Sequence, residues 1–119
     1  MAGINKAILV GRLGRDPEVR NISDDRTVTN FSIATSEEWK DKDTGEKKER
    51  TEWHRIVAFN RLGEICAEYL SKGKMVYVEG KIQTRSWEQD GVTKYTTEII
   101  ASIVQFLDNK NPEKDDIPF

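Results

Sequence analysis

A chain of 119 residues has room for one domain with a real hydrophobic core but not for a second domain. Charged residues make up 34% of it, and no apolar run approaches the roughly 20 residues of a membrane span, which argues against a membrane protein. Acidic and basic residues balance over residues 1–107, so the net charge of −2 lies in residues 108–119. Because a neutral domain still binds phosphate when its basic residues gather on one face, total charge neither favours nor excludes a nucleic-acid partner.

The predicted elements, in chain order, are three strands, one helix and two more strands. Apolar, β-branched and alternating patterns predict strands over residues 7–10, 28–35, 51–59, 75–87 and 92–107. Apolar side chains change to helical spacing between residues 61 and 71, and Gly73 ends this helix. Asp90 and Gly91 form a favoured pair for a tight hairpin turn between the last two strands. The segment 40–50 is almost wholly charged and is predicted as a solvated hairpin loop.

A single helix between the third and fourth of five strands is typical of a five-stranded Greek-key barrel, the OB-fold. A generic β-sandwich is the alternative, but it rarely places one helix at that point. The sequence therefore predicts an all-β OB-fold domain over residues 1–107, followed by a short acidic tail over residues 108–119.

Alternation along the strands places aromatic and basic side chains on the same faces. In the third strand Trp53, Arg55 and Phe59 share one face with Val57, while His54, Ile56 and Ala58 share the other. In the fourth strand Val76, Val78, Ile82 and Thr84 form the apolar side, so Tyr77, Arg85 and Trp87 are expected to point outward. Trp39 lies at the edge of the charged segment, where it is hard to bury.

Aromatic rings interleaved with cations are suited to binding single-stranded nucleic acid, because each base has a face to stack and each phosphate a charge to neutralise. The alternative for each tryptophan is a core cap with one exposed edge. The candidate phosphate contacts are Lys6, Arg12, Arg20, Lys42, Lys47, Lys48, Arg55, Arg61, Lys72, Lys81 and Arg85. Each of these taken alone is more often a plain solvated charge than a phosphate contact, and Arg55 and Arg85 are favoured because they share faces with Trp53 and Trp87.

Features of an enzyme, a metal site or a bound cofactor are not found in the sequence. The chain has one histidine and one cysteine, Cys66, whose place in the predicted helix indicates a buried and inert thiol. No phosphate-binding glycine loop is present. The triplet Asp43-Thr44-Gly45 resembles that of aspartic proteases, but its charged neighbours indicate a surface turn. The first apolar run, from Ala7 to Val10, is too short for a signal sequence, so a cytoplasmic protein is expected.

Four segments carry motifs that occur together in one family. They are NKAILVGRLGRDPEVR (5–20), IATSEEWKDKDTGEKKERTEWHRIVAFNRLGEICAEYLSKG (33–73), VYVEGKIQTRSW (76–87) and YTTEII (95–100). With these motifs the chain resembles the bacterial single-stranded DNA-binding protein family. The resemblance implies an OB-fold subunit of a homotetramer that wraps single-stranded DNA in replication, recombination and repair, associated with the nucleoid. It implies base stacking by Trp39, Trp53, Phe59 and Trp87, and subunit-interface positions for His54 and Tyr77.

The last residues match the acidic tip of the same family. They are Asp115, Asp116, Ile117, Pro118 and Phe119. A basic pocket with a hydrophobic slot would take such a tip, and the resemblance implies replication and repair proteins as its partners. The alternative to a docking role is that the acidic end only increases solubility. Family members usually carry a long linker before the tip, so the chain resembles a short-linker member; a phage, plasmid or accessory paralogue and an engineered linker deletion both stay open.

Two other functions are weighed against this interpretation. An OB-fold protein-interaction subunit of a replication complex needs neither the aromatic set nor the tip. An RNA-binding OB protein of the cold-shock type is usually shorter and lacks the helix. Quenching of tryptophan fluorescence by oligo(dT), and competition between matched DNA and RNA oligomers, would separate the three.

Overall fold

The computed structural model describes residues 2–107. Its elements in chain order are β1 (Ala7–Leu13), β2 (Glu18–Ser23), β3 (Arg26–Lys40), β4 (Lys47–Phe59), α1 (Asn60–Tyr69), β5 (Met75–Gln89) and β6 (Val92–Phe106). The predicted all-β class is confirmed, and so is the single helix ahead of the last two long strands. The predicted hairpin turn is also confirmed, because Asp90 and Gly91 both adopt the positive φ angles, 54° and 79°, that such a turn requires.

All the strands belong to one sheet, in the order β1-β5-β6-β4-β3-β2. Neighbouring strands run antiparallel except β4 and β6, which run parallel where Ile56 is opposite Ile99. A short pairing of β1 with β3, with Arg12 opposite Ala34, closes the sheet into a barrel. Gly11 permits this closure, because a side chain at that position would collide with the Ala34 carbonyl oxygen.

The hydrophobic core fills the inside of this barrel. Ile33 of β3, Ile56 of β4 and Val76 of β5 are each at most 1% exposed and come from alternating inward positions. Cys66 of α1 and Leu70, the residue directly after this helix, belong to the same cluster. Alternation therefore correctly predicted which side of β4, and of the first half of β5, faces the core.

Between residues 2 and 107 the structure has one more strand than the five that the sequence predicted. β2 pairs with β3, beginning with Glu18 opposite Asn30, and every residue of β2 is exposed. A strand with neither face buried has no alternation of apolar and polar residues, so the pattern gave no signal there.

The prediction of a loop over residues 40–50 was too long. β3 continues to Lys40 and β4 begins at Lys47, so the connection covers only residues 41–46. Opposite charges across the ladder stabilise this solvated hairpin, as between Glu38 and Lys47, whose charged atoms are 3.2 Å apart.

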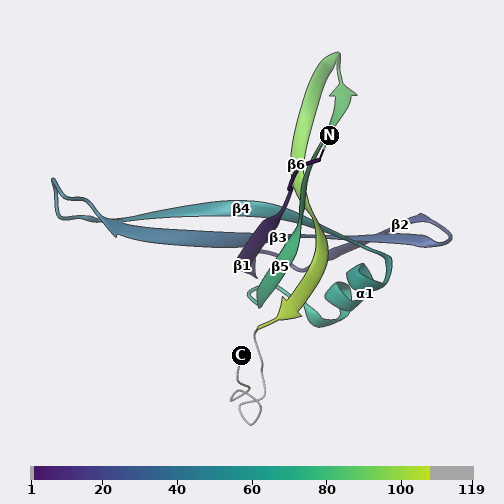
Figure 1. The fold of residues 1–119 in the computed structure, drawn as a ribbon, viewed down its shortest axis with the longest axis horizontal. Coiled ribbons are helices and arrows are strands. Elements are labelled where there is room, and N and C mark those ends of the chain that lie inside the picture. The colour runs from purple at the N-terminus through teal and green to yellow at the C-terminus, as the bar shows by residue number, and fades with distance from the viewer. Residues whose placement is uncertain (1, 108–119) are drawn as a thin grey trace, which may run out of the picture.

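The β3–β4 and β5–β6 hairpins extend beyond the barrel in different directions (Figure 1). This extension corrects the prediction for Ile82, which was expected inside the barrel but is 45% exposed. Ile82 lies on the part of β5 that has left the core, where Asn5 donates a hydrogen bond to its carbonyl oxygen at 2.7 Å and accepts one from its amide at 2.8 Å. Across residues 2–107 no helix is long and apolar enough to cross a membrane.

Candidate nucleic-acid interface

The outward sides of β4, β5 and β6 adjoin where β4 pairs with β6. The parallel pairing of β4 with β6 places Val57 beside Ile100, and Ile100 is opposite Lys81 of β5. Paired residues point to the same side of a sheet, so the outward positions of the three strands adjoin. We call this surface the aromatic face, and its members are Trp53, Arg55, Phe59, Arg85 and Trp87.

Trp53 projects from the aromatic face on β4 and is 57% exposed. A Cβ atom on Gly14 would fall only 2.6 Å from ring carbon Cζ3 of Trp53, so the indole rests directly on the backbone of the loop after β1. The Gly14 amide is itself held, because it donates a hydrogen bond to the Ser32 carbonyl oxygen at 3.2 Å. A residue without a side chain therefore positions the ring while more than half of Trp53 stays open to solvent.

Arg55 follows Trp53 at the next outward position of β4. Its side chain is exposed and, among residues 2–107, lies within ion-pair distance of no carboxylate. Trp53 thus has a neighbouring cation whose charge is not already neutralised.

Phe59 ends the same strip and is half-buried. The guanidinium carbon of Arg26 lies 5.5 Å from the centroid of its ring, within the range of a cation–π contact. Arg26 was not among the predicted contacts. The turn at Asp24 and Asp25 between β2 and β3 brings Arg26 to this position. The sequence signal for this contact was that turn, which the prediction did not recognise as a hairpin.

Trp87 projects from the β5–β6 hairpin and is 39% exposed. The guanidinium carbon of Arg85 lies over its ring, 5.5 Å from the centroid. The same guanidinium donates two hydrogen bonds to the Glu98 carboxylate, from Nε at 3.0 Å and from Nη2 at 3.3 Å. Unlike Arg55, Arg85 is therefore already paired with an anion.

Trp39 lies apart from the aromatic face, although it is 48% exposed. In the β3–β4 ladder Trp39 is opposite Lys48, whereas Trp53 is opposite Ala34. An odd number of steps along β3 separates Trp39 from Ala34, so the two tryptophans point to opposite faces of the ladder. A strand that contacted both rings would have to cross the edge of this hairpin.

The remaining predicted phosphate contacts are spread over the surface. Five of them pair with a carboxylate: Lys6 with Glu79, Arg20 with Glu18, Lys47 with Glu38, Lys48 with Glu46 and Arg61 with Glu64. Arg12 donates a hydrogen bond to the Gly73 carbonyl oxygen at 2.9 Å. Lys42, Lys72 and Lys81 are exposed and form no ion pair with any residue between 2 and 107. The pairs of Arg20, Lys47, Lys48 and Arg61 are exposed on both sides, and such pairs contribute only about 0–1 kcal/mol, so a phosphate can displace them. Glu79, the partner of Lys6, is mostly buried. All these phosphate contacts stay predictions.

A sequence model of the single-strand binding protein family matches residues 4–107, which is most of the chain. The chain belongs to the single-strand binding protein family. Solved structures agree: it is 39% identical to Plasmodium falciparum SSB in its complex with ssDNA, with a TM-score of 0.81, over 91% of this chain and 98% of that one. A deletion mutant of the single-stranded DNA binding protein from Thermus aquaticus is 27% identical, with a TM-score of 0.76, over 91% of this chain and 52% of that one. The predicted family and the OB-fold are thereby confirmed.

The two residues that the family resemblance places at subunit interfaces make contacts within this chain. His54 is half-buried on the side of β4 away from Trp53, with Nε2 2.9 Å from Oγ1 of Thr35. Tyr77 donates a hydrogen bond to the Glu79 carboxylate at 3.3 Å. The hydrogen bond and ion pair with Lys6 lower the pKa of Glu79 and raise the pKa of Lys6, while desolvation raises the pKa of Tyr77.

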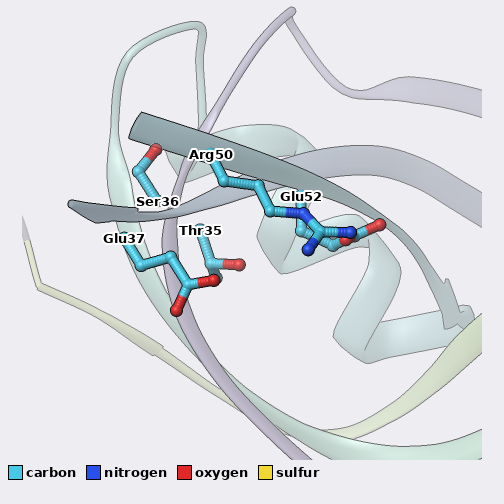
Figure 2. Close-up of a pocket in the computed structure, with 5 residues that line it drawn as sticks. All are labelled: Thr35, Ser36, Glu37, Arg50 and Glu52. Carbon is cyan, nitrogen blue, oxygen red and sulfur yellow. The ribbon is translucent and has the colours of Figure 1, made fainter. Parts of the chain in front are cut away.

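A polar hollow of about 480 Å³ lies on the β3–β4 hairpin. Its lining residues are Thr35, Ser36, Glu37, Arg50 and Glu52. Figure 2 shows these side chains on the two neighbouring strands, with carboxylates on both. The hollow has no aromatic lining residue, and most of its residues are on the face of His54, so it is not an extension of the aromatic face.

The predicted docking tip, from Asp115 to Phe119, lies outside the described residues, as does the rest of the tail. Within residues 2–107, no group of three or more His, Cys, Asp or Glu side chains is placed to hold a metal ion.

Proposed function

We propose that this chain binds single-stranded DNA without sequence preference, by stacking bases on the aromatic face and neutralising phosphates with nearby cations. The aromatic face carries this proposal: Trp53 and Trp87 are 57% and 39% exposed, and each has an arginine two residues away on the same side of its strand. Membership of the single-strand binding protein family supports it. A binding role without catalysis is part of the proposal.

Single strands are favoured over duplex because only unpaired bases offer both faces to a ring. A duplex hides those faces in its own stack, so it could use only the cations of this surface. Base stacking is tolerant of sequence, since every base has a π-face. The surface therefore suits protection of exposed single strands in replication, recombination and repair.

The test is a titration of intrinsic tryptophan fluorescence with oligo(dT), in parallel with a duplex of equal length and with an RNA oligomer. Stacking should quench the emission at low concentrations of oligo(dT) and much more weakly with duplex. The affinity should fall with rising salt in proportion to the phosphates neutralised. Unchanged emission on adding saturating oligo(dT), or equal affinity for duplex, would refute the proposal.

We further propose that the chain forms a homotetramer through a second outward surface, on β1, β5 and β6. Ile8, Val10 and Ile103 are 57%, 47% and 45% exposed there. The strand registers place Ile8 beside Glu79 and Val10 beside Tyr77, so the apolar side chains adjoin the Tyr77 hydrogen bond. A second copy of this chain would cover them, with His54 at another contact.

Mass measured by light scattering on a sizing column tests this assembly. A tetramer is expected, and Ile8→Glu should reduce the mass by placing a charge in an apolar contact. A monomeric wild-type protein would contradict the proposal.

We also propose that the tip recruits replication and repair proteins and that the protein is cytoplasmic and associated with the nucleoid. The support is the sequence of the tip together with the family. Deleting residues 117–119 should abolish partner recruitment while the affinity for oligo(dT) stays equal or rises. Weaker binding to oligo(dT) after this deletion would count against the docking role.

A further inference from the structure

A buried carboxylate lies within the surface that is proposed to meet phosphates. Glu98 is on β6 and is 8% exposed. An anion at this place opposes the approach of a phosphate, and its burial has to be compensated by a partner. That partner is Arg85, which binds both carboxylate oxygens, at 3.0 and 3.3 Å. Two parallel hydrogen bonds fix the plane of a guanidinium as well as its position.

The position in which Glu98 holds Arg85 is over the ring of Trp87. In the β5–β6 ladder Arg85 is opposite Thr96, so Glu98 is its diagonal neighbour on the same face. The guanidinium carbon is 5.5 Å from the centroid of the Trp87 ring, and the Arg85 side chain is 57% exposed. One carboxylate, one guanidinium and one indole are therefore arranged in series across two strands.

We propose that Glu98 is a positioning residue of the DNA interface: it holds Arg85 against one face of Trp87, so that this indole offers a base only its other face. Glu98 also neutralises the charge that Arg85 would otherwise present to a phosphate. This inference rests on the proposed binding of single-stranded DNA and adds a role for two residues within it. It differs from the sequence-based expectation, in which Arg85 was itself a phosphate contact.

The two roles of Arg85 predict different behaviour of its variants. If Arg85 acts on phosphate through charge alone, Arg85→Lys keeps its function. If it acts as a planar cover on Trp87, Arg85→Lys loses the function, because an ammonium neither binds the carboxylate in the same forked geometry nor lies flat on the ring.

The first experiment uses the free protein, so it does not depend on DNA binding. Trp39→Phe and Trp53→Phe together leave Trp87 as the reporter, and acrylamide quenching then measures its exposure. Glu98→Gln or Arg85→Lys in this background should raise the quenching constant to about twice its value, because the second ring face becomes open. Glu68→Gln, which removes an equally negative charge from the exposed surface of α1, is the matched control and should leave the constant unchanged. An unchanged constant in both test variants would overturn the inference.

The second experiment measures the salt dependence of oligo(dT) binding in the otherwise unaltered chain. Glu98→Gln frees the Arg85 charge, so the slope of log K against log salt should become steeper by about 0.7, the value for one further phosphate on a single strand. Arg85→Lys keeps the pair neutral and should leave the slope unchanged. A slope that Glu98→Gln does not alter, or that Arg85→Lys alters as much, would contradict neutralisation by Glu98.

Folding is checked by thermal melting of each variant. Gln has the shape of Glu and needs no cationic partner, so Glu98→Gln should retain the melting transition; if it unfolds, Arg85→Lys decides the question by itself. If wild-type protein fails to bind oligo(dT), the proposed function fails while the acrylamide result still decides whether Glu98 positions Arg85. If wild-type protein binds but neither readout moves, only the inference about Glu98 fails.

Discussion

Trp53 and Trp87 both project from the aromatic face, but different contacts hold them in place. Trp53 lies on β4 against the bare backbone of Gly14, a contact made by shape alone. Trp87 lies on the β5–β6 hairpin beneath Arg85, and a buried carboxylate holds that arginine. Trp53 is 57% exposed and Trp87 is 39% exposed.

This difference shows two ways to display an aromatic ring in water. A backbone support involves no charge, so Arg55 next to Trp53 keeps its charge for a phosphate. An ionic support uses the nearest cation and covers part of the ring. We therefore expect the Trp53 region to contribute more of the binding free energy than the Trp87 region, and more of the salt dependence.

The largest effect is expected from Trp53→Ala. Removing a stacking ring costs about 1–3 kcal/mol of binding free energy per base. Because Trp53 is the more exposed of the two rings, we expect its loss to cost about 2–3 kcal/mol. The measurement is the affinity for oligo(dT) by polarisation of a labelled oligomer, at fixed salt. A loss smaller than that of Trp87→Ala would reverse the comparison.

Trp87→Ala is expected to cost less, about 1–2 kcal/mol, because only one ring face is available to a base. The same titration measures it. Removing both members of the pair, by Arg85→Ala and Glu98→Gln in the Trp87→Ala chain, should cost little more, since the pair is neutral as a whole and neither charge is left unpaired. A large further loss would show that Arg85 contacts phosphate directly.

A smaller effect is expected from Gly14→Ala. The new methyl group would overlap the Trp53 ring and tilt it, so affinity should fall, by less than about 1 kcal/mol because the ring is still present. Gly3→Ala is the matched control, because nothing lies within 4 Å of a Cβ atom at Gly3. The double variant Gly14→Ala/Trp53→Ala should bind oligo(dT) as tightly as Trp53→Ala alone, because no ring is left for the methyl group to tilt. A weaker affinity of the double variant would assign Gly14 a role apart from supporting the ring.

The sequence predicts much of the fold because most strands have one buried side. Alternation correctly placed Ile56 and Val76 inside and Trp53 outside. It failed at Ile82, since a residue pattern does not tell where a strand leaves the core, and it missed β2, whose residues are all exposed.

The candidate site was predicted in part, for a similar reason. Trp53 and Arg55 are neighbours along one strand, so strand periodicity pairs them. The contact of Gly14 with Trp53 joins segments far apart in the sequence, and no local pattern reveals it. The pairing of Arg85 with Glu98 was accessible in principle, because counting back from the Asp-Gly turn sets the register of β5 against β6.

The smallest expected effect concerns the core, and it decides whether the other comparisons are valid. Burial raises the pKa of the Cys66 thiol from 9.0 to about 11, so the folded chain holds this proton more tightly than the unfolded chain. The resulting stabilisation is fully present below pH 9.0 and is lost as the pH rises through about 11. At pH 8 the thiolate is roughly 100-fold scarcer in the folded chain than in urea, so a disulfide reagent should label native Cys66 at least that much more slowly. Trp53→Ala, Trp87→Ala and Gly14→Ala should label as slowly as the wild-type protein, because none of them touches the core cluster. Faster labelling in one variant would mean that its loss of affinity reflects a loosened barrel rather than a lost base-stacking contact. That variant would then not test the comparison between the Gly14 backbone under Trp53 and the Arg85–Glu98 pair on Trp87.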